Sequence, residues 1–157
     1  MRTSRTAQIE VYQDMMRTAA EGIDRAERQA TAEADTLAAL VALPINGYTE
    51  AAAARKAKFH SIARRQLRKV ANALGLCSKD YDLRTNKAGI AVAGETTLHT
   101  ETLYVQITAN GSALGDVMFR ACDGRKDYCG KHNRFAPAGA LDDVADFYAE
   151  LQRAGLI

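Results

Sequence analysis

The chain has 157 residues, of which 47% are hydrophobic and 25% charged, with three cysteines and a formal net charge of +2 at pH 7. This length suits one domain with one buried core, and the composition excludes a collagen-like or intrinsically disordered chain. The odd cysteine count, the lack of an N-terminal apolar segment and the absence of any run near the ~20 residues that cross a bilayer lead us to expect a cytoplasmic protein, not one in a membrane.

The charges are unevenly distributed along the chain. Residues 1–79 hold 13 Lys/Arg and 8 Asp/Glu, whereas residues 80–157 hold 8 and 11. Such an asymmetry is typical of a surface that binds an anionic partner, or of two halves that attract each other.

A repeat of apolar residues predicts a long amphipathic helix within residues 1–45. A 3–4 spacing sustained over four heptads is typical of a helix that packs along another helix. Two partners satisfy it: the next helix of the same chain, or a second copy in a homodimer through residues 9–40. Glu33 alone interrupts the repeat, whose positions are Ile9, Tyr12, Met16, Ala19, Ile23, Ala26, Ala30, Glu33, Leu37 and Leu40.

A second helix is predicted over residues 49–75. Pro44 and the Asn-Gly pair at 46–47 end the first helix, and Thr49 is suited to cap the second. Gly75 fits the left-handed position beyond its last turn. The two helices are therefore expected to form an antiparallel helical hairpin.

The pattern of residue types changes after Lys79. Residues 80–135 contain short β-branched and aromatic segments at 89–94, 102–108 and 116–122, separated by Gly, Asn and Asp. They predict a small antiparallel β-meander, and residues 137–155 predict a C-terminal helix. The expected fold is a single α+β domain over residues 1–157.

The Asp123-Gly124 pair predicts a two-residue β-hairpin, because this dipeptide favours the turn that joins adjacent strands. Counting outward from the turn places Arg120 opposite Asp127 and Phe119 opposite Tyr128, both stabilising pairs.

The same register bears on metal binding. It holds Cys122 and Cys129 about 13 Å apart along the strands, too far to share one ion. A site that combines them with His132 and the distant Cys77 is therefore disfavoured. We expect no metal and no other cofactor.

Few residues in the chain indicate catalysis. No phosphate-binding glycine loop, dinucleotide fingerprint or nucleophile elbow occurs. His99 and Glu101 are two positions apart, on one face of a predicted strand, where a base and an acid could act together, although the bland interpretation is a solvent-facing sheet edge with Thr97. A motif-free enzyme using His99, Glu101 or His132 is the third alternative, and we expect no enzyme.

The strongest functional signal is the segment Ala54–Val70, which holds seven basic residues with no acid between Glu50 and Asp80. Projected on a helix, its apolar residues gather on one face and its cations on the other, as a phosphate-binding surface requires. The candidate nucleic-acid-binding residues are Lys58, Arg64, Arg65, Arg68 and Lys69, with a second group at Arg125, Lys126, Lys131 and Arg134.

We therefore hypothesise a non-catalytic binding protein that contacts the backbone of DNA or RNA. The main alternative is a protein-interaction module, an adaptor or inhibitor of a nucleic-acid-handling machine, that binds an acidic protein surface. A structural explanation also exists, because acids of the C-terminal helix could neutralise the basic helix within the chain. These acids are Asp142, Asp143, Asp146 and Glu150.

Overall fold

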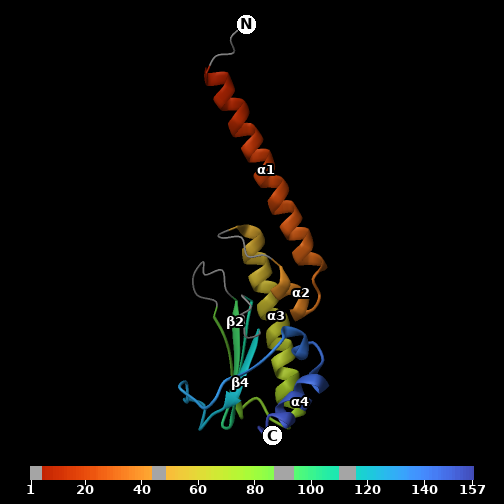
Figure 1. The fold of residues 1–157 in the computed structure, drawn as a ribbon, viewed down its shortest axis with the longest axis vertical. Helices are drawn as coiled ribbons and strands as arrows, with labels where there is room; N and C mark the ends of the chain where they lie inside the picture. Colours follow the sequence, from red (N-terminus) through yellow and green to blue (C-terminus); the bar gives the residue numbers. More distant parts are fainter. Residues whose placement is uncertain (1–4, 44–48, 87–93, 110–115) are drawn as a thin grey trace.

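The computed structural model describes residues 5–43, 49–86, 94–109 and 116–157. It confirms the α+β class: four α-helices and a five-stranded antiparallel sheet, with helices at both ends of the described chain (Figure 1). None of the described helices combines the length and apolarity needed to cross a membrane. The elements are α1 (Arg5–Glu33), α2 (Leu37–Ala42), α3 (Glu50–Ala73), β1 (Tyr81–Thr85), β2 (Glu95–Thr100), β3 (Leu103–Thr108), β4 (Val117–Ala121), β5 (Arg134–Ala136), the 3₁₀ helix η1 (Ala138–Leu141) and α4 (Val144–Arg153).

Helix α1 packs against the rest of the chain only near its C-terminal end. Thr31 is buried there, but no side chain of residues 5–26 is buried. Figure 1 shows this part of α1 extending away from the body formed by the other elements. Where α1 and α3 meet, Arg28 pairs with Glu50 and Lys58 bonds Thr31, so the two helices run in the same direction there and not in the antiparallel directions expected. Most of the apolar repeat has no partner in the described chain.

The long helix predicted at 1–45 is in fact two helices. Thr36 caps α2 by accepting a 3.1 Å hydrogen bond from the Ala39 N–H. The Asp142 carboxylate accepts two more, from the N–H groups of Leu37 at 2.7 Å and Ala38 at 3.0 Å. Because these acceptors satisfy N–H groups that a continuous helix would bond internally, they stabilise the break after α1.

Helix α3 begins and ends where the sequence predicts. The Thr49 hydroxyl accepts a 3.1 Å hydrogen bond from Ala52, and Gly75 adopts a φ of 73° just beyond the last turn. The face of α3 that carries Phe59, Ala63 and Leu67 is fully buried against the sheet.

The sheet has the strand order β1-β2-β3-β4-β5. Its inner face meets α3 and α4, where Phe119 of β4 packs edge to face on Phe147 at 5.4 Å. Strands β1 and β5 were not among the predicted segments, and β2 was anticipated only in the assignment of His99 to a strand. Of the segment predicted at 89–94, residues 89–93 lie outside the described residues and Gly94 immediately precedes β2.

The predicted hairpin at Asp123-Gly124 is wrong. Strand β4 pairs with β5 in a register that places Met118 opposite Phe135 and Phe119 opposite Arg134. Residues 122–133 form a long loop instead. The Gly124 N–H donates a 2.8 Å hydrogen bond to the Glu101 carbonyl in the β2–β3 turn. The Asp-Gly segment therefore bonds another turn of the sheet and does not join two adjacent strands.

Candidate nucleic-acid interface

The outward face of α3 carries three exposed cations, Arg65, Arg68 and Lys69. We call these three residues the basic triad. Their spacing of three and four positions places them on neighbouring turns of one helix face. No described carboxylate forms an ion pair with any of them.

The other two cations predicted on this helix have structural partners. The Lys58 ammonium donates to the Thr31 and Ala32 carbonyls at 2.9 and 2.8 Å, and lies 3.3 Å from Asp35. It thus binds the C-terminal end of α1, where the helix dipole favours a cation. Arg64 is half-buried and donates to the Leu83 carbonyl of β1 at 3.2 Å.

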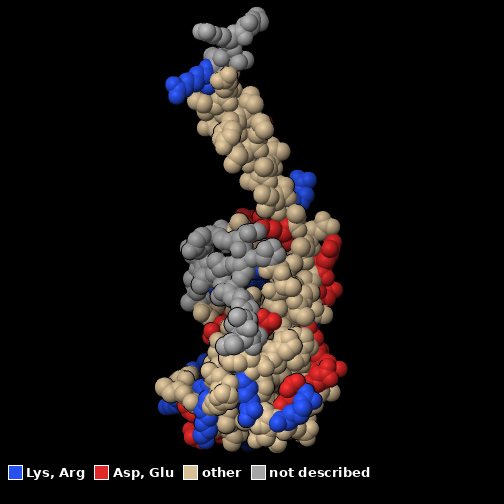
Figure 2. All heavy atoms as spheres, viewed as in Figure 1, with Lys and Arg blue, Asp and Glu red and all other residues tan. Residues whose placement is uncertain are grey.

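The acids of α4 do not neutralise the basic triad through any described ion pair. Asp142 binds the start of α2, and the Asp143 side chain caps α4 by accepting from Ala145 at 2.9 Å. Glu150 pairs with Arg153 on its own helix. Figure 2 shows acidic side chains gathered along the side of the body where α2 and α4 lie.

The second predicted basic group lies on the loop 122–133 and on β5, and half of it is paired. Arg125 donates to Glu101 at 2.8 Å, and Lys131 lies 2.7 Å from Asp123. Lys126 and Arg134 are exposed. Arg134 belongs to β5, which is the sheet edge opposite β1, so it is separated from the edge where α3 packs.

The loop also folds over the outer face of the sheet. His99 follows core residue Leu98 on β2, so the two side chains point to opposite faces. On the outer face, the Tyr128 ring of the loop lies 5.5 Å from the His99 ring. Arg125 of the same loop lines a pocket with Leu74 at the end of α3, so the loop does not lie wholly on the side of the sheet away from α3.

Where the loop meets the sheet lies a polar cluster of His99, Tyr104, Arg120, Asp127 and Tyr128, in which His99 and Arg120 are buried and Tyr128 is 58% exposed. The sequence predicted the Arg120–Asp127 pair but not the rest of this cluster. The Arg120 side chain is 3% exposed, and its guanidinium lies 4.6 Å from the centre of the Tyr104 ring. It donates to the Asp127 carbonyl at 2.9 Å and lies 3.9 Å from the Asp127 carboxylate. Neighbouring strands bring Tyr104 and Arg120 into register, a pairing that local sequence signals do not reveal.

The electrostatics of this cluster favour the neutral form of His99. Burial and the nearby Arg120 charge both lower the pKa of His99, and its Nε2 has no hydrogen-bond partner among the described residues. The pKa of Asp127 is also lowered, chiefly by hydrogen bonds from the Asp123 and Gly130 N–H groups. Such an arrangement holds the loop on the sheet through a buried, hydrogen-bonded guanidinium.

The residues considered for a motif-free enzyme are not brought together. His99 is 2% exposed under Tyr128, on an internal strand and not at a sheet edge. Glu101 lies in the β2–β3 turn, where it pairs with Arg125, and His132 is exposed in the loop.

The cysteines are also separated. Cys122 is buried, its thiol donates to the Thr100 carbonyl at 3.4 Å, and burial raises its pKa. Cys77 and Cys129 are exposed. Within the described ranges, no three His, Cys, Asp or Glu side chains converge as a metal site would require.

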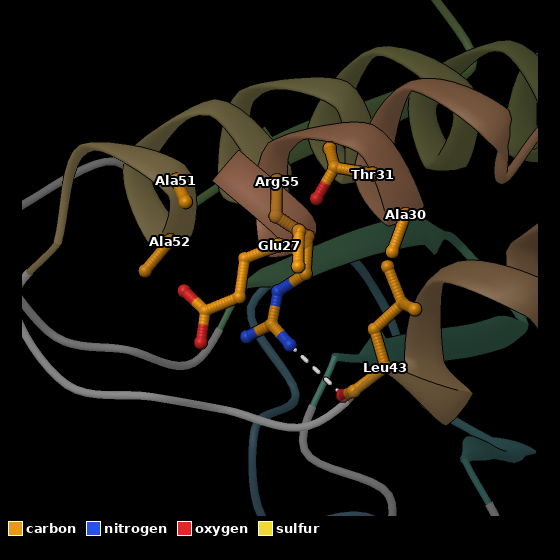
Figure 3. A pocket seen from close by; sticks show the side chains of 8 residues that line it. Glu27, Ala30, Thr31, Leu43, Ala51, Ala52 and Arg55 are labelled. Carbon is orange, nitrogen blue, oxygen red and sulfur yellow. Dashed lines mark hydrogen bonds between the residues drawn. The ribbon is translucent and has the colours of Figure 1, made fainter. Parts of the chain in front are cut away.

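A mainly apolar pocket of about 220 Å³ lies between the base of α1, the end of α2 and the start of α3 (Figure 3). The buried Arg55 guanidinium points into it beside Glu27 and donates to the Leu43 carbonyl at 2.9 Å. Burial lowers the pKa of Arg55, and Glu27 opposes this effect. Arg55 thus ties the end of α2 to α3.

Comparison with known proteins gave no match: no family model, no curated protein and no solved structure is similar to this chain at a significant level.

Proposed function

We propose that the basic triad on α3 binds the phosphodiester backbone of a nucleic acid. The observation that carries the proposal is that three exposed cations with no described carboxylate partner lie together on one face of α3, whereas eight other cations lie within ion-pair distance of a carboxylate. The paired cations are Arg17, Arg28, Lys58, Arg84, Arg120, Arg125, Lys131 and Arg153.

The character of the face favours backbone contacts over base contacts. Ser61 and Asn72 flank the triad at helical spacing, and both are exposed. Hydroxyl and amide groups add hydrogen bonds to phosphate oxygens, while cations supply most of the affinity. No aromatic side chain lies at these positions for base stacking, so the proposed binding has little sequence preference.

The test measures binding to labelled single- and double-stranded DNA and RNA by fluorescence anisotropy at several salt concentrations. Substituting Arg65, Arg68 and Lys69 by Gln removes three cations and keeps good helix formers at exposed positions. If all three contact duplex phosphates, the slope of log K against log salt becomes shallower by about 2.7. The affinity of the triple variant at low salt is also expected to fall below that of the wild type.

A matched control separates a specific surface from net charge. Substituting Arg5, Arg25 and Lys79 by Gln also removes three exposed cations, none on α3 and none among the predicted binding residues. The control is expected to retain nearly the wild-type slope. Equal losses in both variants would refute the α3 surface. Absence of wild-type binding at low salt would refute the nucleic-acid proposal, and would direct the search to an acidic protein partner of the same face.

A further inference from the structure

The projecting part of α1 exposes a continuous apolar seam to solvent. We define the seam as Ile9, Tyr12, Met16, Ala19, Ile23 and Ala26. The four large side chains of this seam are 49–64% exposed, which is unusual for apolar residues that recur on one helix face. Contiguous apolar patches on soluble proteins usually mark a contact site.

Between residues 10 and 25, the charged side chains of α1 lie on the face opposite the seam. At about 100° per residue, the charged positions between 10 and 25 centre roughly 150° from the seam. Many are paired within the helix, as Asp14 is with Arg17 and Asp24 with Arg28. The positions that flank the seam are largely uncharged. A second helix laid along the seam would therefore meet no barrier of like charges.

The seam is complementary to itself when a second copy runs in the opposite direction. If Met16 of one copy faces Ala19 of the other, Ile9 faces Ala26 and Tyr12 faces Ile23. Two of these three layers place a large side chain against alanine, as close helix packing requires. In the flank, Met15 of one copy then lies near Gly22 of the other, whose missing side chain leaves open space.

We propose that α1 is the dimerisation element of the protein and pairs with α1 of a second copy in this antiparallel register. The two bodies then lie at opposite ends of the helix pair, because each joins its own α1 beyond Ala26. A symmetric contact of this kind closes on itself and produces a dimer, not a filament.

The charge of α1 argues against a lipid surface as the occupant of the seam. Residues 5–33 contain four arginines and six acids, so the helix is net negative. Helices that lie on membranes usually carry Lys and Arg on the polar face, because cell membranes are anionic.

The first test compares two adjacent substitutions by sedimentation velocity at micromolar concentrations. Tyr12→Gln alters the seam, whereas Val11→Gln changes a residue about 110° away from it. The two side chains are similarly exposed, at 64% and 61%. Because the symmetry places Tyr12 in two layers, its substitution is expected to weaken the dimer at least a hundredfold, while Val11→Gln leaves it nearly unchanged. Neither residue contacts the body, so far-UV circular dichroism should be similar for both variants.

The outcomes decide the proposal. A wild-type chain that is monomeric at all concentrations overturns it, as does a dimer that both substitutions leave intact. A monomer that co-sediments with anionic lipid vesicles assigns the seam to a membrane instead.

The second test addresses direction. In a chain with Cys77 and Cys129 replaced by Ser, an Ile9→Cys protein is mixed with an Ala26→Cys protein and treated with a short bis-maleimide. The antiparallel register predicts cross-links between the two proteins and none of Ile9→Cys to itself, because the two Ile9 positions are then about 25 Å apart along the helix pair. Efficient cross-linking of Ile9→Cys to itself would overturn the register and indicate a parallel pair.

Discussion

Replacing Gly130 by Ala tests whether the buried Arg120 guanidinium holds the 122–133 loop on the sheet. A Cβ atom at this position would lie 1.2 Å from Arg120 Nη1 and 2.1 Å from its Cζ. Such distances are far inside van der Waals contact, so the guanidinium must move. Because Arg120 is only 3% exposed, its guanidinium is enclosed by protein and cannot simply swing out into solvent.

The expected cost follows from the bonds that the movement breaks. Arg120 donates to the Asp127 carbonyl at 2.9 Å and lies 3.9 Å from its carboxylate. Losing a charge-assisted hydrogen bond and weakening a buried ion pair costs about 3 kcal/mol. For a domain of this size, that lowers the melting temperature by about 6–12 °C. Urea unfolding followed by circular dichroism gives the free energy directly.

Gly139→Ala is the matched control, because its added Cβ meets only the Ala38 Cβ at an ordinary 3.8 Å. A double-mutant cycle sharpens the test: in an Arg120→Ala background, Gly130→Ala should cost less than about 1 kcal/mol, since the clash is gone. If Gly130→Ala destabilises the wild type no more than Gly139→Ala does, the steric argument is wrong.

Two further predictions concern buried and capping polar groups. Burial and Arg120 lower the pKa of His99 in the folded protein. Between the folded-state pKa and about 6.5, the unfolded chain therefore binds more protons at this residue than the folded protein does. The free energy of unfolding should decline as the pH falls through this window. A His99→Phe variant should show a flatter dependence of unfolding free energy on pH in that window, and an unchanged slope would contradict the assignment. Asp142→Ala should lower the free energy of unfolding by about 1–3 kcal/mol, because the Leu37 and Ala38 N–H groups lose their acceptor. Asp146→Ala, at an exposed position, is the control in the same urea titration. Equal losses in the two variants would show that the Asp142 hydrogen bonds add little stability.

Local signals in the sequence predicted the ends of α3 correctly. Thr49 and Gly75 act through bonds and dihedral angles within a few residues, so their context is contained in the adjacent sequence. The Asp123-Gly124 signal was just as local, yet it failed. The Gly124 N–H found a distant acceptor at Glu101, and β4 took β5 as its partner in place of the residues that follow the turn.

The positions of the cations on α3 were predicted more accurately than the contacts that each cation makes. Helical projection identified the outward face, but it could not show that Lys58 reaches the end of α1 or that Arg64 reaches β1. Those partners are 27 and 19 residues away in the sequence. The hairpin register predicted Arg120 opposite Asp127, and the two residues do meet, but Asp127 arrives there on the loop and not on a paired strand. The pairing of Tyr104 with Arg120 depends on the β3–β4 register, which local signals did not predict.

The bond from Lys58 to the base of α1 has a mechanical consequence. Residues 5–26 form a lever about 33 Å long, and a rotation of only 10° at its base would move its tip by about 6 Å. One ammonium group, with the Thr31 and Ala32 carbonyls and Asp35 around it, lies at the pivot. The direction in which the seam points therefore depends in part on Lys58, which lies far from the seam, and in part on the 3.2 Å ion pair between Arg28 and Glu50. A neutral residue at position 58 would weaken the hold on the base of α1 without altering the seam.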